Sequence, residues 1–237
     1  MRPIGFSTGA LARGDFRRAL RLLQNHHVHT VELSALRMDE LEPLVTSLPD
    51  LDLQNFTFTS IHAPSRFDLQ AESGVIQILS SPQAADYPIV VHPDVIFTPA
   101  LWRRFGGRLL IENMDKRKSV GRTVAELQTV FDLLPDAKFC FDIGHARQVD
   151  PTMTEAAFLL RAFGERLAEV HISEVNTASR HDPISLNATS AFQRVAKWIP
   201  QDIPVILEPL IDKGQSDLDT EIRRARQALQ FERPAAA

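Results

Sequence analysis

Short apolar segments alternate along the chain with segments in which apolar residues recur at helical spacing. The apolar segments are PIGFST (3–8), TVELSA (30–35), FTFTSIHA (56–63), YPIVVHP (87–93), RLLIENM (108–114), KFCFDIGHA (138–146), AEVHISE (168–174) and PVILEP (204–209). Runs that are apolar on both faces are typical of parallel strands covered by helices. The pattern therefore predicts eight parallel β-strands separated by helical connections.

The connections carry stripes of apolar residues at helical spacing. The stripes are Leu41, Leu44, Val45 and Leu48; Phe192, Val195, Ala196 and Ile199; and Leu218, Ile222, Ala225 and Leu229. Thr123 with Glu126, and Thr152 with Glu155, read as capping boxes that predict two helix starts. The helical signal is weak over 66–86 and 98–106, where few apolar residues recur at this spacing.

Eight strand–helix units in 237 residues fit a single closed (β/α)8 TIM barrel. We expect the barrel to comprise residues 1–232 and residues 233–237 to form a disordered C-terminal tail. The alternative is an open doubly wound sheet. It is disfavoured because GFSTGALARG, at the end of the first strand, lacks the G-x-G-x-x-G turn.

Composition narrows the class of protein. No apolar run approaches the roughly 18 residues of a membrane span, and the N-terminus lacks the apolar core of a signal peptide. The single cysteine, Cys140, excludes an intrachain disulfide and suits a cytoplasmic location, and its Phe neighbours suggest a small core residue. The net charge of −4 argues against a dedicated nucleic-acid binder. We expect an enzyme with a small-molecule substrate and no membrane partner.

The predicted strands end in imidazole and carboxylate side chains. Along the chain these are His62, His92, Glu112, Asp142, His171 and Glu208, and His145 and His181 lie just beyond two of the strands. Active sites of (β/α)8 barrels lie at the C-terminal strand ends, so these side chains should meet at one rim. Buried charges are costly unless they are paired or coordinated, and zinc and its relatives bind imidazole and carboxylate. The sequence thus predicts a divalent-metal site, with zinc or manganese as the ion.

Other polar residues have two possible roles each. Glu32, within the second strand, is either a ligand or a salt-bridged support for one. Arg66, Lys116 and Arg180 are candidate substrate-binding residues near the rim. The basic stretch 116–118, with Arg122, either binds a substrate anion or is an ordinary solvated loop. The remaining histidines, at 26, 27 and 29, precede the second strand and should lie at the opposite, structural end of the barrel.

The strand endings SIHAPS, VVHPD, LLIENMD, FDIGHA, EVHISE and VILEPL, in this order, resemble the xylose isomerase-like barrels. That group includes endonuclease IV (AP endonuclease family 2) and many sugar isomerases and epimerases. An endonuclease IV-like arrangement implies a first zinc on His62, His92 and Glu112. It implies a second metal on Glu112, Asp142, His171 and Glu208. A third would use His145 and His181, but Ser179 stands where the family has a carboxylate, and Asp182 is a possible substitute.

The single-metal epimerases of this group imply a smaller set of ligands, namely Glu112, Asp142, His171 and Glu208. There the two glutamates also act as catalytic acid and base, and His145 would contact the substrate.

Two enzymatic hypotheses follow. A polynuclear phosphoester hydrolase with two or more ions is favoured, because a single-metal isomerase does not need His62 and His92. The alternative is a sugar (phosphate) isomerase or epimerase that uses Glu112 and Glu208 for proton transfer. DNA is disfavoured as a substrate because the loops are short and Phe67 is the only aromatic residue near His62. A third hypothesis, an inactive ligand-binding barrel, conflicts with the near-complete ligand set.

Overall fold

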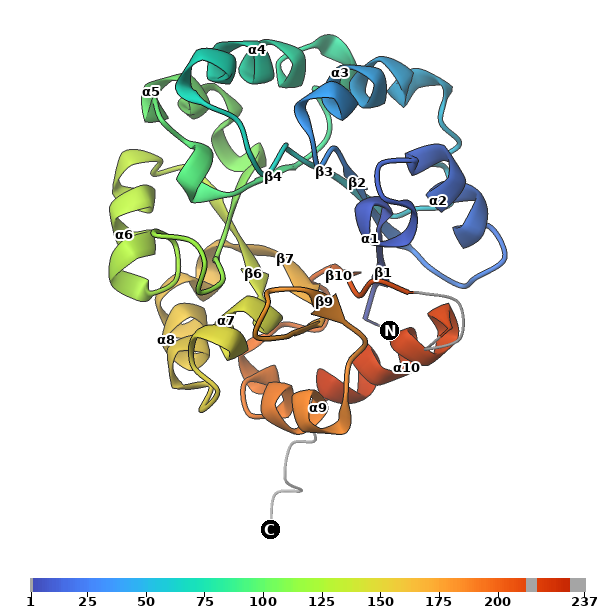
Figure 1. Ribbon diagram of the computed structural model, residues 1–237, viewed down its shortest axis with the longest axis vertical. Helices are drawn as coiled ribbons and strands as arrows, with labels where there is room; N and C mark the ends of the chain where they lie inside the picture. The colour runs from blue at the N-terminus through green and yellow to red at the C-terminus, as the bar shows by residue number, and fades with distance from the viewer. Residues whose placement is uncertain (1, 212–216, 231–237) are drawn as a thin grey trace.

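Eight parallel strands form a closed barrel surrounded by helices (Figure 1). The computed structural model describes residues 2–211 and 217–230. The barrel strands are β1 (Ile4–Ser7), β2 (Thr30–Ser34), β3 (Phe58–His62), β4 (Ile89–Val91), β5 (Leu109–Glu112), β6 (Lys138–Asp142), β7 (Leu167–Ile172) and β10 (Val205–Leu207). Seven of them lie within the apolar segments and β7 begins one residue before its segment, so the predicted single (β/α)8 barrel is confirmed. The predicted tail, 233–237, lies outside the described residues.

The strands follow one another around the barrel in chain order, and β10 closes it against β1. Every neighbouring pair in the barrel is parallel, including β1 with β10. All C-terminal strand ends therefore meet at one mouth. A two-stranded antiparallel hairpin of β8 (Glu174–Val175) and β9 (His181–Asp182) follows β7.

Helices fill the connections. The α-helices are α1 (Thr8–Ala12), α2 (Phe16–Leu23), α3 (Met38–Ser47), α4 (Leu69–Leu79), α5 (Pro99–Trp102), α6 (Val124–Leu133), α7 (Ile143–Val149), α8 (Thr154–Phe163), α9 (Leu186–Gln193) and α10 (Leu218–Ala228). The short 3-10 helices are η1 (Leu48–Asp50), η2 (Pro82–Ala84), η3 (Pro93–Val95), η4 (Arg103–Arg108), η5 (Gly164–Arg166) and η6 (Ala196–Trp198). The predicted stripes on α3 and α10 pack inward, whereas the stripe 192–199 is divided between α9 and η6.

Helix α4 is regular although its sequence signal is weak. Its buried positions are Glu72, Val75, Ile76 and Leu79, which have helical spacing. Glu72 breaks the apolar stripe, and its Oε1 accepts hydrogen bonds from the backbone N–H of Phe97 and from Trp102 Nε1. A buried carboxylate with such donors is tolerated, but it hides the stripe from a reading based on hydrophobicity.

The two predicted capping boxes differ in outcome. Thr123 caps α6 by accepting a hydrogen bond from Glu126 N–H, but the Glu126 carboxylate accepts from Arg122 N–H instead of completing the box. The box of Thr152 with Glu155 is wrong: α8 begins at Thr154 after Met153, whose φ is 63°. The Glu155 carboxylate instead accepts from the backbone N–H at 124, which ties α8 to α6.

Successive side chains of each strand point to opposite faces, so the protein has one hydrophobic core between strands and helices and a second inside the barrel. Phe139 and Phe141 of β6 belong to the large core between strands and helices, whereas Cys140 packs inside the barrel with Val90 and Leu110. Cys140 is fully buried, which confirms that it is a small core residue, and burial raises the pKa of its thiol well above the usual range. Residues two positions further along these strands point into the same interior, nearer the mouth.

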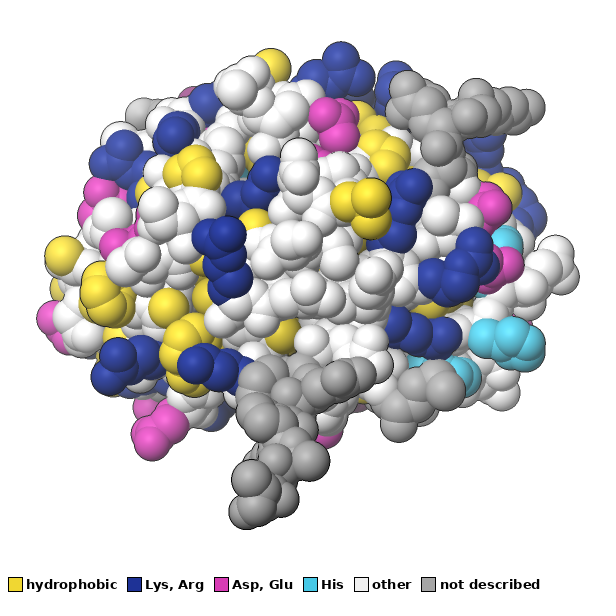
Figure 2. Space-filling model, turned by 90° about the horizontal axis from the view of Figure 1, so that it is seen from below, with side chains coloured by type: hydrophobic (Ala, Val, Ile, Leu, Met, Phe, Trp, Pro, Cys, Tyr) yellow, Lys and Arg dark blue, Asp and Glu magenta, His cyan; other side chains and the backbone are white. Residues whose placement is uncertain are grey.

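Over the part of the chain that is described, none of the helices is both long and apolar enough to span a bilayer. On the flank at the bottom of Figure 1, Lys and Arg side chains are scattered among uncharged and acidic ones (Figure 2).

Candidate metal centre

The strand geometry brings the predicted ligands to the barrel mouth. His62, Glu112 and Asp142 are the last residues of β3, β5 and β6. Glu112 and Asp142 lie two residues beyond the interior residues Leu110 and Cys140, so the final side chains of β5 and β6 point into the barrel. His171 pairs in register with Asp142, and His92 and Glu208 directly follow β4 and β10.

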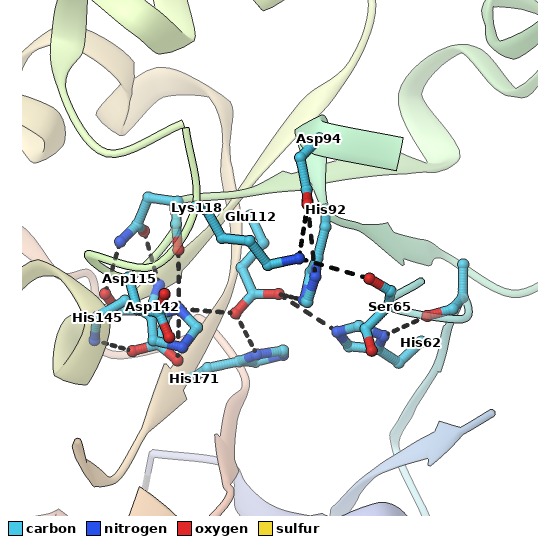
Figure 3. A network of polar contacts seen from close by, with 12 residues as sticks. His62, Ser65, His92, Asp94, Glu112, Asp115, Lys118, Asp142, His145 and His171 are labelled. Carbon is cyan, nitrogen blue, oxygen red and sulfur yellow. Dashed lines mark hydrogen bonds and ion pairs between the residues drawn. The ribbon is translucent and has the colours of Figure 1, made fainter. Parts of the chain in front are cut away.

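Glu112 lies at the centre of the cluster (Figure 3). Its Oε2 is 3.3 Å from His62 Nε2 and 3.1 Å from His92 Nε2. Its Oε1 is 3.4 Å from Nδ1 of both His145 and His171. The carboxylate therefore faces imidazole nitrogens on both sides, and its side chain is only 2% exposed.

The hydrogen bond of the His62 ring decides which of its two nitrogens carries the proton in the neutral form. His62 Nδ1 lies 2.7 Å from the carbonyl oxygen of Ala63, which can only accept, so this nitrogen is the donor. In the neutral ring, His62 Nε2 then directs a lone pair at the Glu112 carboxylate. This repulsion is removed either by a second proton on the ring, whose Nε2–H then donates to Glu112 at 3.3 Å, or by a metal cation between the two atoms.

Several buried polar atoms at the mouth have no hydrogen-bond partner among the described residues. They are His92 Nδ1, Asp142 Oδ2, His171 Nδ1 and Glu208 Oε2. Unpartnered donor and acceptor atoms in a buried site call for an explanation, and a bound ion supplies one. The residues present thus fit divalent metal ions.

Three groups of side chains have ligand atoms within 4.8 Å of one another at the mouth. They are His62, His92 and Glu112; Glu112, Asp142, His171 and Glu208; and Asp142, His145 and His181. All eight residues expected from the sequence fall into these groups, and Glu112 is common to the first two. The third group takes its carboxylate from Asp142, and neither Ser179 nor Asp182 belongs to it. Asp182 instead accepts a hydrogen bond from Asn176.

A fourth group, Glu32, Glu169 and His171, lies deeper in the barrel. Glu32 Oε2 is 3.1 Å from His171 Nε2, a contact that is compatible with both roles expected for Glu32, ligand or salt-bridged support. Glu169 was missed by the sequence reading. The signal for it was available, because it stands two residues before His171 on a strand and must point into the same interior.

Asp142 both faces the site and starts a helix. Its Oδ1 accepts a hydrogen bond from His145 N–H at 2.6 Å, which caps α7 and fixes His145 beside the other ligands. Gly144 lies in the first turn of α7. The glycine is needed there because a Cβ would lie 2.5 Å from the carbonyl oxygen of Ser173.

We therefore expect Gly144→Ala to lower the free energy of unfolding by about 1–3 kcal/mol, as overpacking of a close backbone contact does. Chemical denaturation provides the measurement. Gly74→Ala in α4 is the matched control, because nothing lies within 4 Å of its added Cβ, and it should gain about 0.5–1 kcal/mol. Equal stabilities of Gly144→Ala and the parent protein would show that α7 does not need the glycine.

The candidate substrate-binding residues lie outside the ligand groups. Arg66, Lys116 and Arg180 are exposed in loops of the mouth, after β3, after β5 and beside β9. Lys116 also lines a cavity of about 260 Å³ together with Arg147. The basic stretch behaves differently, because its other members are paired: Arg117 with Asp115, Lys118 with Asp94 and Arg122 with Glu126.

A partly buried ion pair lies beside the first group of candidate ligands. Lys118 Nζ lies 2.6 Å from Asp94 Oδ2, and Asp94 Oδ1 lies 4.0 Å from His92 Nδ1 (Figure 3). The sequence reading noted Lys118 only as part of a basic stretch and did not assign Asp94. Proximity of Asp94 to His92 in the sequence was the one available signal.

An aromatic pair joins the segments that follow β3 and β4. Phe67 forms an edge contact with Phe97, with ring centroids 6.2 Å apart, and Phe97 is 43% exposed. The sequence analysis considered only aromatic residues close to His62 along the chain, and Phe97 was missed because it follows a different strand, β4. The loops after β3 and β4 thus present a small apolar surface.

The carboxylates raise the affinity of the neighbouring groups for protons. Burial alone would lower the pKa of His62, but the charge of Glu32 and the hydrogen bond to Glu112 outweigh it and raise the pKa to about 9. Burial raises the pKa of Glu208 to about 8, and the charges of Asp142 and Glu112 act in the same direction. Without an ion, the site therefore holds protons that a metal would displace.

The stability of the metal-free protein should fall as the pH rises from about 6.5 to about 9. His62 has a folded-state pKa above its ordinary 6.5, so its contribution is complete below 6.5 and is lost as the pH passes 9. Glu208, with a folded-state pKa raised from 4.5, acts with the same sign. Urea denaturation of chelator-treated protein at several pH values measures the effect. A flat or rising stability over this interval would contradict the assignment.

The remaining histidines lie at the other end of the barrel, as expected. His26, His27 and His29 line a cavity of about 400 Å³ between α2 and the segment before β3. His26 Nδ1 contacts Asp219 of α10 at 3.0 Å.

The fold and the mouth define a (β/α)8 barrel with a candidate metal centre, and this class agrees with comparisons to known proteins. The chain belongs to the xylose isomerase-like TIM barrel family, whose model matches residues 98–231. The sequence matches no curated protein.

Three solved structures share the fold over nearly the whole chain. A proposed sugar phosphate isomerase/epimerase from Anabaena variabilis has a TM-score of 0.61 at 13% identity and covers 97% of this chain and 98% of its own. Endonuclease IV from Thermus thermophilus has a TM-score of 0.61 at 19% identity, with 97% and 99% covered. The structure named AsfvAP:AG has a TM-score of 0.65 at 12% identity, also with 97% and 99% covered. At these identities the likeness concerns the fold.

Proposed function

We propose that the protein is a divalent-metal-dependent phosphoester hydrolase with two or more zinc or manganese ions, acting on a small or non-duplex substrate. The observation that carries the proposal is the position of Glu112. One of its oxygens faces His62 and His92, and the other faces His145 and His171. A carboxylate with imidazoles on both sides suits a bridge between two ions.

The first ion would be held by His62, His92 and Glu112, and the second by Glu112, Asp142, His171 and Glu208. Such ions supply Lewis acidity, which activates water and neutralises charge on a phosphoester. The protein residues orient these groups: β3, β5 and β6 fix their final side chains, and the hydrogen bond of His62 to the Ala63 carbonyl sets the ring tautomer. Burial of the cluster keeps bulk water out.

The exposed cations of the mouth suit the binding of an anionic substrate. Arg66, Lys116 and Arg180 lie in three different loops of the mouth and can contact a phosphate while it faces the ligands. His145 and His181 offer a third ion position with Asp142, or contact the substrate. The name of the Thermus relative, endonuclease IV, is in line with phosphoester chemistry. The net charge of −4 favours a small or non-duplex substrate over bulk DNA.

A sugar phosphate isomerase or epimerase is the second candidate. It is favoured by one observation: Glu112 and Glu208 share a ligand group, and Glu208 has a pKa raised to about 8. A carboxyl group that titrates near neutral pH can exchange a proton with a substrate carbon. The name of the Anabaena relative matches this chemistry.

His92→Ala separates the two candidates, because His92 belongs only to the first ligand group. We expect the metal-loaded parent protein to hydrolyse phosphomonoesters or phosphodiesters, and the variant to lose about 100-fold or more of kcat/KM. His26→Ala, at the opposite end of the barrel, is the control and should retain activity. Ketose epimerisation that survives His92→Ala, without any phosphoester hydrolysis, would favour the isomerase instead.

A further inference from the structure

The two nitrogens of the His171 ring face different carboxylate pairs. Nδ1 faces the mouth, 3.4 Å from Glu112 and 3.5 Å from Glu208. Nε2 faces the barrel interior, 3.1 Å from Glu32 Oε2 and 3.3 Å from Glu169 Oε1. The side chains of His171, Glu32 and Glu169 are all 0% exposed.

Of the two interior carboxylates, Glu169 is the hydrogen-bond partner of the ring. The contact of His171 Nε2 with Glu169 Oε1 has hydrogen-bond geometry, whereas Glu32 Oε2 has no hydrogen-bond partner within the described part of the chain. Ser60 Oγ donates to the same Glu169 oxygen at 3.0 Å, and Ser34 Oγ donates to Glu32 Oε1 at 3.0 Å. Ser60 of β3 reaches Glu169 of β7 across the barrel interior, and Ser34 holds Glu32 on the same strand, β2, so both carboxylates are fixed under the ring.

We propose that Glu169 is a positioning residue that holds the Nε2–H of His171 and thereby presents the Nδ1 lone pair to the second ion. Glu32 adds a second negative charge beside the same nitrogen. This inference rests on the proposed metal centre and deepens it, because it assigns a role to a carboxylate that binds neither ion. A carboxylate on the distal nitrogen fixes the tautomer of a metal-binding imidazole and increases its basicity.

The alternative role for Glu169 is purely structural, and the two roles differ in which ion is affected. Of the two proposed ion positions only the second includes His171, whereas the first is formed by His62, His92 and Glu112. Loss of the Glu169 carboxylate should therefore weaken the second ion selectively. A packing role would affect the stability of the fold and both ions alike.

The test is metal titration of the chelator-treated chain with Zn²⁺ and with Co²⁺, the latter followed by its visible absorption. We expect Glu169→Gln to weaken the second ion by about 10–100-fold, and to leave the first unchanged. Glu169→Ala, which also loses the acceptor oxygen, should weaken the second ion further and change the Co²⁺ spectrum. Glu72→Gln is the matched control, because Glu72 is equally buried but bonds to Phe97, Thr98 and Trp102.

Unchanged affinity for the second ion in Glu169→Gln, or an equal loss for both ions, would overturn the positioning role. Failure of the proposed function is distinguishable from this outcome. A parent chain that binds two ions and hydrolyses no phosphoester overturns the hydrolase and leaves the positioning role standing. A parent chain that binds no second ion overturns both.

Discussion

Glu112→Gln should abolish most of the activity, with a loss of about 1000-fold in kcat, because one substitution removes a ligand from both proposed ion positions. The loss corresponds to about 4 kcal/mol, within the several kcal/mol that metal ions contribute to charge stabilisation in the transition state. The glutamine has the same shape but cannot supply the negative charge that faces four imidazoles. Steady-state kinetics and metal analysis of the same preparation measure both effects.

The matched control for this variant is Glu126→Gln, which changes a partly exposed glutamate of α6 that pairs with Arg122. A surface ion pair of this kind contributes little, so activity and metal content should stay at the parent values. Circular dichroism and thermal unfolding should be measured on both variants, because removing the charge that faces four buried imidazoles lowers the stability of the metal-free fold. Full activity in Glu112→Gln would mean that Glu112 does not bridge two ions.

Removal of metal should lower the thermal stability by about 5–10 °C for each ion that the chelator extracts. An ion present at 100 times its dissociation constant stabilises the folded state by about 2.7 kcal/mol. For a domain of this size, each kcal/mol shifts the midpoint by about 2–4 °C. Differential scanning calorimetry with and without a chelator measures the shift, and readdition of Zn²⁺ or Mn²⁺ should restore it.

The metal-free protein should also respond to pH in the opposite sense to the metal-loaded one. Without ions, His62 and Glu208 stabilise the fold through the protons that they hold, and this contribution is lost as the pH rises. With ions, protons compete with the metal, so stabilisation by metal should increase over the same interval. A chelator that leaves the midpoint unchanged at every pH would show that the buried carboxylates are stable without ions.

The residues at the strand ends could be predicted because side chains alternate between the two faces of a strand, and because the parallel strands of a barrel all end at the same mouth. Once KFCFDIGHA is a strand whose apolar half ends at Phe141, Asp142 must reach the mouth, and the same reasoning places Glu112 and His171 there. The helix that begins immediately after Asp142 was not predicted, because a hydrogen bond from His145 N–H to the Asp142 side chain, and not an apolar stripe, starts it.

Buried or partly buried polar residues outside the predicted ligand set were harder to predict. Glu169 lies within an apolar strand segment and contacts Ser60, which is 109 residues away in the sequence, so only the closed barrel reveals their pairing. The ion pair of Asp94 with Lys118 was missed for the same reason, because the two residues follow different strands and approach each other only in the closed barrel. Helix α4 gave a weak signal because the buried Glu72 interrupts its apolar stripe. The donors that make this burial possible, Phe97 N–H and Trp102 Nε1, lie in a segment that contacts the helix only in the folded protein.

The metal content of the purified chain tests the central claim most directly, because it requires no knowledge of the substrate. Elemental analysis by mass spectrometry, after removal of loosely bound ions, counts zinc and manganese for each polypeptide. A Glu112 bridge between two ligand groups predicts two or more ions for each chain, and fewer in His62→Ala. A parent chain that holds at most one ion, with activity unaffected by His62→Ala, would contradict the polynuclear centre.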